Sequence, residues 1–421
     1  MKAPANRSVF IVGYGAATPL GPTFSETWRR AAQGVSGLRR LTRCELQTRS
    51  NVVGEIPGWD PEALDFVGKK EAYNWNAGFV LLTMAVCREA LAHAGLPLDE
   101  NIGPRTACLV GSALNGTDAY RTAMDNFLQR GPLKISPYLL PNLCANVPAG
   151  KSGMLEGFTG PIFSPQGACA SGNHAIGIGA RMIRDGDCDV ALVGGVDTCL
   201  IPEIIHGFAN MLATISVGPK DRAHQDPAQA SRPFSIDRKG MVLSEGGGVL
   251  VLAADDIVAA HGLKARAEVM GIGWTSDAFH FTQPNEATIV RAIREAVDDA
   301  GLQPDDIQVV NTHGTSTPKG DQTEVACLRR VFGARMGKIP LSSNKSQIGH
   351  SLGAAAAIEA ALAIEGMQQG LILPTINYLP DPQLDDIDVV PDSARRQAHE
   401  IVLSNAFGFG GTNCCVVLRG L

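Results

Sequence analysis

The sequence predicts an α/β fold in which helices alternate with buried strands. Apolar residues recur at helical spacing between residues 169 and 185, and a continuous apolar run follows at 189–197, as in a strand covered on both faces. The same strand-and-helix order returns later in the chain, without a clear sequence repeat. The high glycine content, 47 of 421 residues, favours tight turns. We therefore expect two similarly built halves, residues 1–252 and residues 253–421.

The other elements follow from apolar periodicity and from the glycines and prolines that end it. The first half is expected to contain strands over 9–15, 106–111 and 246–252 and helices over 23–33 and 71–95. The second half is expected to contain strands over 308–311 and 414–418 and helices over 287–300 and 358–369. The polar segment 216–231 is expected to form an exposed loop that covers the entrance of a site.

Charge and composition narrow the possible functions. The chain has 36 lysines and arginines against 42 acidic residues, and this net charge of −6 argues against a general nucleic-acid-binding protein. The 10 cysteines include no CxxC pair, so neither zinc nor a disulfide framework is indicated, and a reducing cytoplasm is expected. Residues 1–8 do not form a signal peptide, and no membrane span is visible. Gly13 and Gly15 match a dinucleotide-binding loop only weakly.

A cysteine among small residues begins the predicted helix of the first half. Cys169 is expected in the first turn, where free backbone N–H groups and the helix dipole favour the thiolate. Its small neighbours leave room for a thioester carbonyl to approach the sulfur. Most single cysteines are inert buried side chains, so the position gains weight only from motifs further along the chain.

Two histidine motifs lie in the second half. His313 follows the strand over 308–311, and sites in open α/β sheets lie beyond the carboxyl ends of strands. The alternative is a turn histidine satisfied by local hydrogen bonds. His350 is preceded by Lys345 and followed by an alanine-rich helix. Glu359 on that helix would be a buried charge, for which Lys345 is the obvious partner.

Two hydroxyl groups and a glycine-rich turn complete the pattern. Thr315 and Thr317 stand close to His313 in the sequence and suit an amide-rich ligand arm. Phe409 lies between glycines, which permit a close backbone approach and a mobile ring. This turn lacks the lysine and the following helix of a phosphate-binding loop.

These motifs, in this order and spacing, resemble the β-ketoacyl synthases, the condensing enzymes of fatty-acid and polyketide assembly, and most closely their 3-oxoacyl-[acyl-carrier-protein] synthase II group. The resemblance runs from residue 9 to residue 418 and is carried by the segments 164–177, 311–321, 342–353 and 403–413. It implies a thiolase-like fold with two duplicated halves in a five-layered α-β-α-β-α arrangement, usually a homodimer. It also implies a cytoplasmic enzyme without a cofactor, whose substrates are carried on the phosphopantetheine of an acyl carrier protein.

The resemblance assigns the chemistry to five residues. Cys169 would take the acyl group from its carrier, and the backbone N–H groups of Cys169 and Phe409 would form the oxyanion hole. His313 and His350, as neutral imidazoles, would hold the enolate that forms when malonyl-carrier loses CO2. Lys345 would maintain the local balance of charge. Neither histidine would need to act as a base, because the helix end would lower the pKa of Cys169.

Further positions are expected from the same resemblance. Phe409 would also gate the site, and an acidic carrier would be attracted by a basic surface. The remaining assignments are Thr315 and Thr317 for the pantetheine arm, Glu359, Asp321 and Glu324 for support, Lys69, Lys70 and Lys134 for carrier docking, and Asn311, Glu359, Ser404 and Asn405 around a structural monovalent cation.

The sequence also departs from the family pattern. Residues 166–167 are Gln-Gly where Ala-Thr or Asp-Thr is more common, the loop over 216–230 looks longer, and Leu133 replaces a frequent arginine of the docking loop. These departures leave open a ketosynthase of a type II polyketide or aryl-polyene pathway. A thiolase would use Cys414 or Cys415 as a base, but both histidine motifs weigh against it. A non-catalytic chain-length factor would lack the nucleophilic cysteine.

Overall fold

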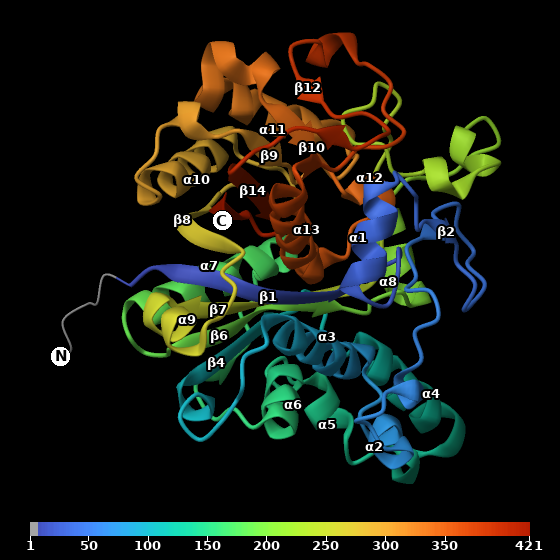
Figure 1. Ribbon diagram of the computed structural model, residues 1–421. Coiled ribbons are helices and arrows are strands. Elements are labelled where there is room, and N and C mark those ends of the chain that lie inside the picture. Colours follow the sequence, from blue (N-terminus) through green and yellow to red (C-terminus); the bar gives the residue numbers. More distant parts are fainter. Residues whose placement is uncertain (1–6) are drawn as a thin grey trace.

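A mixed sheet of 11 strands runs through the computed structural model, which describes residues 7–421 (Figure 1). Residues 1–6, part of the segment analysed for a signal peptide, lie outside the described residues. From edge to edge the strands are β12 (Asp388–Val389), β10 (Pro340–Ser342), β9 (Val309–Asn311), β14 (Ile401–Gly408), β15 (Thr412–Gly420), β8 (Ala267–Ser276), β1 (Val9–Ala17), β7 (Gly246–Ala254), β6 (Val190–Asp197), β4 (Thr106–Gly111) and β5 (Ile162–Phe163). Two separate ribbons pair β2 (Arg39–Arg40) with β3 (Val52–Val53) and β11 (Leu371–Ile372) with β13 (Arg395–Arg396).

The sheet consists of two similarly arranged groups of strands. β4 pairs in parallel with β6, and β9 pairs in parallel with β10 and β14. Towards the middle the pairing becomes antiparallel, in β6–β7–β1 and in β14–β15–β8. The two groups meet where Phe10 and Ile11 of β1 pair with β8. The predicted boundary after residue 252 lies near the end of β7, and the division into two units remains a prediction.

Helices cover both outer faces of the sheet and fill the space between its two groups of strands (Figure 1). One outer face carries α3 (Gly78–Ala94) and α6 (Val147–Glu156), and the other carries α10 (Glu286–Asp299) and α11 (Pro318–Phe332). Between the groups lie α7 (Ser171–Arg184) and α13 (Ala355–Gln369), which contact strands of both. The predicted α/β fold with five layers is therefore confirmed.

The remaining helices lie around this core. They are α1 (Phe24–Ala32), α2 (Lys69–Asn74), α4 (Thr117–Arg130), α5 (Leu139–Leu143), α8 (Pro202–Asn210), α9 (Asp255–His261) and α12 (Lys345–Ile348). Among the residues that the structure describes, no helix combines the length and apolar content needed to cross a bilayer.

Small residues let the two central helices pack closely. A Cβ added at Gly172 of α7 would lie 2.7 Å from the backbone nitrogen of Ala357 in α13. Strands β6 and β7 are buried along their whole length, because helices cover both of their faces. The close packing of α7 on α13 places the residues just before α7 next to the segment that leads into α13.

The predicted helix over 71–95 is wrong in one respect, because two helices take its place. The backbone leaves helical geometry at Trp75, between α2 and α3. The side chain of Asn142 holds this break: its amide donates to the carbonyl of Asn74 at 2.9 Å, and its oxygen accepts from the N–H of Ala77 at 3.3 Å. A distant polar side chain thus replaces the helical hydrogen bonds that the local pattern predicts.

The segment 216–231 is more firmly anchored than the predicted exposed loop. The guanidinium of Arg232 donates to both oxygens of Asp221, at 3.1 and 2.8 Å, and both side chains are buried. Ser231 donates to the backbone carbonyl of Lys345 at 2.7 Å. These bonds fix the segment against the part of the chain that carries Lys345.

Candidate active site

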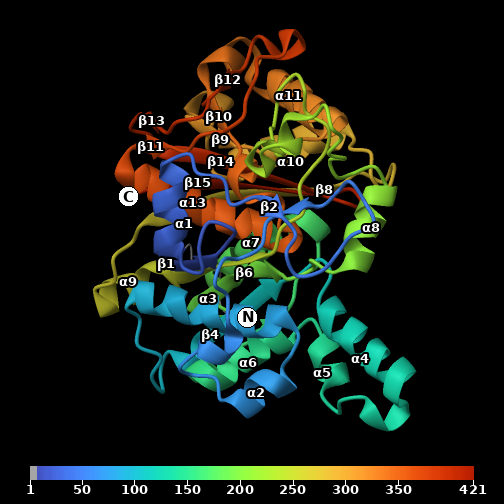
Figure 2. The same ribbon diagram turned by 90° about the vertical axis from the view of Figure 1, so that its right-hand side faces the viewer.

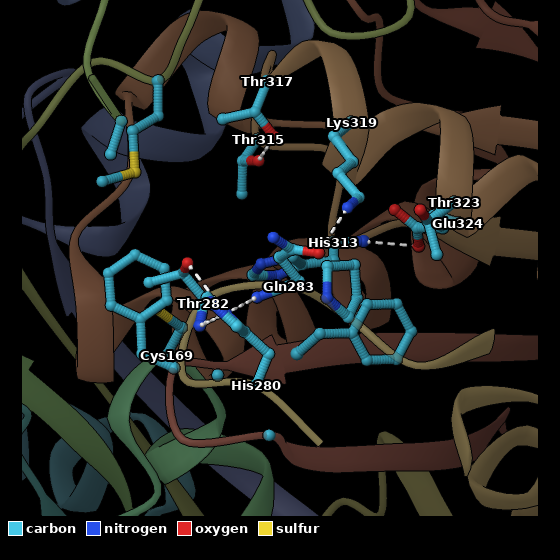
Figure 3. A pocket seen from close by; sticks show the side chains of 18 of the residues that line it. Cys169, His280, Thr282, Gln283, His313, Thr315, Thr317, Lys319, Thr323 and Glu324 are labelled. Atoms are coloured by element: carbon cyan, nitrogen blue, oxygen red, sulfur yellow. Dashed lines mark hydrogen bonds between the residues drawn. The ribbon is translucent and has the colours of Figure 1, made fainter. Parts of the chain in front are cut away.

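A cavity of about 320 Å³ brings together residues that are far apart in the sequence (Figure 3). Cys169, His313 and His350 all line it, together with Thr315 and Phe409. The four predicted motifs therefore meet in one place. The segment 216–231 does not contribute to the described lining, so the prediction that it covers the entrance is wrong.

The turn that carries Cys169 is fixed by its neighbours. Cys169 lies in a 3₁₀ turn, Ala168–Ala170, immediately before α7 and outside the predicted first helical turn. Ala168 adopts a φ of 48°, a conformation that costs energy for a residue with a Cβ. Ser171 stabilises the turn, because its hydroxyl donates to the carbonyl of Ala168 at 2.7 Å and accepts from the N–H of Gly167 at 3.0 Å.

The thiol of Cys169 is protonated in the resting cavity. Its side chain is buried, and this loss of hydration raises the pKa of Cys169 to about 12. The positive charge of Lys345 and the backbone N–H of Phe409, which faces the sulfur, act in the opposite direction. The expected lowering of the pKa by the helix end is therefore wrong, since α7 begins only after Cys169 and burial outweighs the favourable groups.

The two histidines face each other as neutral rings. The ring centroids of His313 and His350 are 5.5 Å apart in an edge-on arrangement, and Phe407 lies 5.5 Å from His313 on another side. Burial, followed by the charge of Lys345, lowers the pKa of both histidines well below the ordinary value. Each neutral imidazole keeps one N–H to donate. The Nδ1 atom of His350 has no hydrogen-bond partner within residues 7–421.

The predicted pairing of Lys345 with Glu359 is present. The Nζ atom lies 2.5 Å from Oε1 of Glu359, and each side chain is only 1% exposed. Burial raises the pKa of Glu359 to about 7, although Lys345 opposes this shift. Neither residue is part of the described cavity lining. Lys345 therefore acts on Cys169 and the histidines through its charge.

Two acidic residues of α11 shape the segment that follows His313. Glu324 accepts the backbone N–H groups of His313 and Gly314, each at 2.8 Å. Asp321 accepts the N–H of Ser316 at 3.1 Å, and Ser316 has a φ of 70°. The carboxylates therefore hold an irregular backbone in one conformation, and their supporting role in the reaction stays a prediction.

Aromatic rings and hydroxyl groups form the outer part of the cavity. The ring of Phe409 lies 6.1 Å from that of Phe208 and 5.8 Å from that of Phe281. The hydroxyl groups of Thr315 and Thr317 are 3.0 Å apart (Figure 3). A Cβ added at Gly408, beside Phe409, would lie 2.5 Å from the carbonyl of Gly167, so β14 packs closely on the turn of Cys169.

Sequence analysis missed one wall of the cavity, the loop between β8 and α10. His280, Thr282 and Gln283 line the cavity, and Nδ1 of His280 accepts the N–H groups of the other two at 3.1 and 3.2 Å (Figure 3). The ammonium of Lys319 donates to Oε1 of Gln283 at 2.8 Å. The sequence signal that could have indicated this wall is a histidine with two phenylalanines in a polar stretch.

Two of the four residues expected around a cation are in contact, and the other two each have a buried oxygen that is free. Asn311 donates to the hydroxyl of Ser404 at 2.9 Å. In the described part of the chain, Oε2 of Glu359 and Oδ1 of Asn405 are buried without a hydrogen-bond partner. Oxygen ligands of this kind fit a hard cation. By contrast, Lys69, Lys70 and Lys134 are exposed and are not part of the cavity lining.

Comparison with known families and proteins gives a consistent picture. The family model of the β-ketoacyl synthase N-terminal domain matches residues 6–256, and that of the C-terminal domain matches residues 266–379. The 3-oxoacyl-[acyl-carrier-protein] synthase 2 of Staphylococcus aureus is 34% identical over 98% of this chain and 98% of its own. The enzyme of that name from Vibrio cholerae is also 34% identical, over 99% of both chains.

Solved structures share the fold over nearly the whole chain. A β-ketoacyl synthase from Burkholderia phymatum has a TM-score of 0.88 and 32% identity, with 99% of this chain and 100% of that chain covered. A type II polyketide ketosynthase, solved with its acyl-carrier protein and a hexaketide, has a TM-score of 0.89 and 26% identity. The comparison again covers 99% of this chain and 100% of that chain. The chain therefore belongs to the β-ketoacyl synthase family of acyl-transferring condensing enzymes.

Proposed function

We propose that the protein is a 3-oxoacyl-[acyl-carrier-protein] synthase that elongates fatty acids by decarboxylative condensation. One observation carries this proposal: a buried cysteine and two neutral histidines line a single cavity. The similarity to enzymes named 3-oxoacyl-[acyl-carrier-protein] synthase 2 supports the choice of substrate class. The reaction requires no cofactor, since all its steps use the thiol, the imidazoles and backbone N–H groups.

The first step transfers the acyl group to Cys169. The sulfur attacks the thioester carbonyl, and the N–H groups of Cys169 and Phe409 stabilise the oxyanion; one such donor is worth about 3 kcal/mol. The carbon–sulfur bond to the carrier then breaks. Cys169 starts as a thiol and loses its proton in this step. The sulfur of the departing carrier gains a proton, so the carrier leaves as a thiol.

The second step builds the new carbon–carbon bond. Malonyl-carrier loses CO2, and the electron pair of the broken bond forms an enolate. The enolate oxygen accepts hydrogen bonds from the N–H groups of His313 and His350. The enolate carbon attacks the acyl carbonyl on Cys169. The carbon–sulfur bond breaks, a 3-oxoacyl-carrier leaves, and the thiolate takes up a proton from water. Neutral histidines suit this step, because they are donors without carrying a charge that burial would penalise.

An acyl carrier protein is the proposed macromolecular partner. A structurally similar ketosynthase has been solved in complex with its acyl-carrier protein. Lys69 and Lys70 begin α2, Lys134 ends the short turn after α4, and all three are exposed. These lysines can attract an acidic carrier. A cytoplasmic location, expected from the scattered cysteines, remains a prediction.

A homodimer is proposed from the apolar surface around α4, which projects from the body of the molecule (Figure 2). Leu128, Leu133 and Leu140 are 73%, 95% and 72% exposed. Exposed apolar side chains that gather in this way are typical of an interface. The short edge strand β5 belongs to the same part of the chain and has a free edge in the described sheet.

A structural monovalent cation is also proposed. The free oxygens of Glu359 and Asn405, together with Asn311 and Ser404, would supply its ligands. Bound there, the cation would neutralise buried negative charge close to Lys345 and would take no part in bond making.

Two rival functions are distinguished by the cavity. Cys414 and Cys415 are fully buried and are absent from the described lining, so the second cysteine that a thiolase requires is not in reach. A ketosynthase of a type II polyketide or aryl-polyene pathway is the second candidate, because structurally similar proteins include a polyketide ketosynthase and the ishigamide ketosynthase/chain length factor.

The test is CO2 release from malonyl-carrier in the presence of an acyl-carrier. The wild-type protein should release CO2 and form the 3-oxoacyl-carrier, whereas Cys169→Ala should form none of this condensation product. Condensation of acetyl-CoA without CO2 release would instead support a thiolase. Saturated acyl donors of several lengths, compared with polyketide donors, separate the two remaining pathways.

A further inference from the structure

A lysine of the cavity has no role in the reaction described above. Lys319, near the start of α11, lines the same cavity as Cys169 and is the one lysine or arginine in the described lining. It forms no ion pair with the rest of residues 7–421. Its ammonium donates instead to the neutral side chain of Gln283 in the loop between β8 and α10, at 2.8 Å (Figure 3).

The position of Lys319 follows from the segment that leads away from His313. His313, Thr315 and the consecutive residues 317–320 line the cavity. The intervening Ser316 faces away, where its hydroxyl accepts a backbone N–H of the core. His313 lies beside the reacting groups and Lys319 is exposed, so the series leads from the reaction centre to the cavity mouth.

The negative groups of the cavity are already engaged. Asp277 accepts the N–H of Asn285 at 3.1 Å and the amide of Asn413 at 2.7 Å. Glu324 accepts two backbone N–H groups next to His313. Within residues 7–421 no ion pair joins either carboxylate to Lys319, whose ammonium is held by a neutral hydrogen bond.

A second donor lines the same cavity. Nδ1 of His280 accepts two backbone N–H groups, so in the neutral ring the proton sits on Nε2. His280 lines the same part of the cavity as Gln283. An ammonium and an imidazole N–H in the lining of one cavity are donors that suit a phosphoryl group.

We propose that Lys319 binds the phosphate at the outer end of a pantetheine arm and so positions the thioester at Cys169, while Gln283 holds the ammonium ready in the free enzyme. This proposal rests on the proposed function. The same phosphate chemistry comes from two sources, the phosphodiester of a carrier and the diphosphate of coenzyme A. Because the contact is formed at an exposed mouth, it should contribute about fivefold in affinity.

The proposal is tested by measuring acylation of Cys169 with intact-protein mass spectrometry. Four thioesters of one acyl group serve as donors, with pantetheine, 4′-phosphopantetheine, coenzyme A or a carrier as the thiol part. Wild-type protein should show an apparent KM about fivefold lower for the phosphopantetheine donor than for the pantetheine donor. Lys319→Gln should abolish this difference, Lys319→Arg should keep it, and Lys338→Gln, a change at an exposed lysine outside the cavity, should leave it unchanged. Added salt should reduce the wild-type preference.

The outcomes separate the phosphate site from the reaction itself. A loss in Lys319→Gln with the phosphopantetheine, carrier and coenzyme A donors alike supports the shared phosphate chemistry. A loss confined to coenzyme A shows that Lys319 contacts only the diphosphate of that donor and overturns the proposal for the carrier phosphate. An equal KM for pantetheine and phosphopantetheine in wild type, or an undiminished preference in Lys319→Gln, overturns the proposal while Cys169 is still acylated. If no donor acylates Cys169 in wild type, the proposed function fails as well.

Discussion

At the scale of single residues, the reacting groups are brought together in their uncharged forms. Burial keeps Cys169 as a thiol and both histidines as neutral rings, and Lys345 supplies the nearby positive charge. The motifs allowed Cys169, His313, His350 and Lys345 to be predicted from sequence. The protonation state of Cys169 could not be predicted, because it depends on burial by segments far away in the chain.

The pKa of Cys169 predicts how alkylation depends on pH. With a pKa of about 12, the thiolate fraction is small at neutral pH, and the rate of labelling by iodoacetamide should rise about tenfold per pH unit from pH 7 to pH 10. Peptide mass spectrometry measures the rate, with the exposed Cys144 as an internal reference for the reagent. A plateau between pH 6 and pH 8 would show a stable thiolate and contradict this description.

The buried ion pair predicts a pH-dependent stability. The pKa of Glu359 is about 7 in the folded protein and about 4.3 when unfolded, so its contribution to stability is present below pH 4.3 and is lost as the pH rises to 7. The free energy of unfolding of wild type minus that of Glu359→Gln should therefore decrease from pH 4.5 to pH 7.5. Urea denaturation measures both, with Glu295→Gln on the exposed face of α10 as the control. A difference that increases with pH would contradict the shift.

At the scale of elements, the site depends on how closely β14 approaches the turn before α7. Sequence analysis predicted the main strands and helices because each has a clear apolar period. It missed the break at Trp75 and the cavity wall between β8 and α10, because both depend on contacts between distant segments.

The close approach of β14 can be tested at Gly408. An added methyl group would lie 2.5 Å from the carbonyl of Gly167 and 3.2 Å from the nitrogen of Cys169. Gly408→Ala should therefore displace the oxyanion donors and lower kcat about 100-fold, since a shift near 1 Å has this effect on positioned groups. Gly150→Ala, where an added Cβ meets nothing within 4 Å, should retain activity. Wild-type kcat in Gly408→Ala would refute the argument.

The carrier surface is tested by reversing charge on α2. Lys69→Glu combined with Lys70→Glu should raise the KM for carrier-bound substrate about tenfold, because attraction becomes repulsion. The KM for a short pantetheine thioester should not change. Lys338→Glu is the matched control. Equal effects on both substrates would exclude docking at α2.

At the scale of the whole molecule, five layers place two groups of strands around a shared pair of central helices. This arrangement explains how the turn before α7 and the segment from α12 to α13, from different halves of the chain, bring the thiol and the buried ion pair close together. The two-part pattern was visible in the sequence. The continuity of the sheet through β1 and β8 was not, because it is formed by a short contact between strands.

The apolar surface around α4 predicts the oligomeric state. Wild-type protein should sediment as a dimer, and Leu133→Asp combined with Leu140→Asp should yield a monomer, because charges would replace exposed apolar contacts. Analytical ultracentrifugation over a range of concentrations measures this. A monomeric wild type, or a double variant that remains dimeric, would contradict the interface.

The central claim is that one cysteine carries the growing chain until malonyl-carrier releases it. The most direct measurement incubates the protein with an isotope-labelled acyl-carrier, identifies the labelled peptide by mass spectrometry, and then adds malonyl-carrier. The label should be found on Cys169 and should move into a 3-oxoacyl-carrier with release of one CO2 for each acyl group. Label on another residue, or transfer to product without CO2 release, would contradict the account.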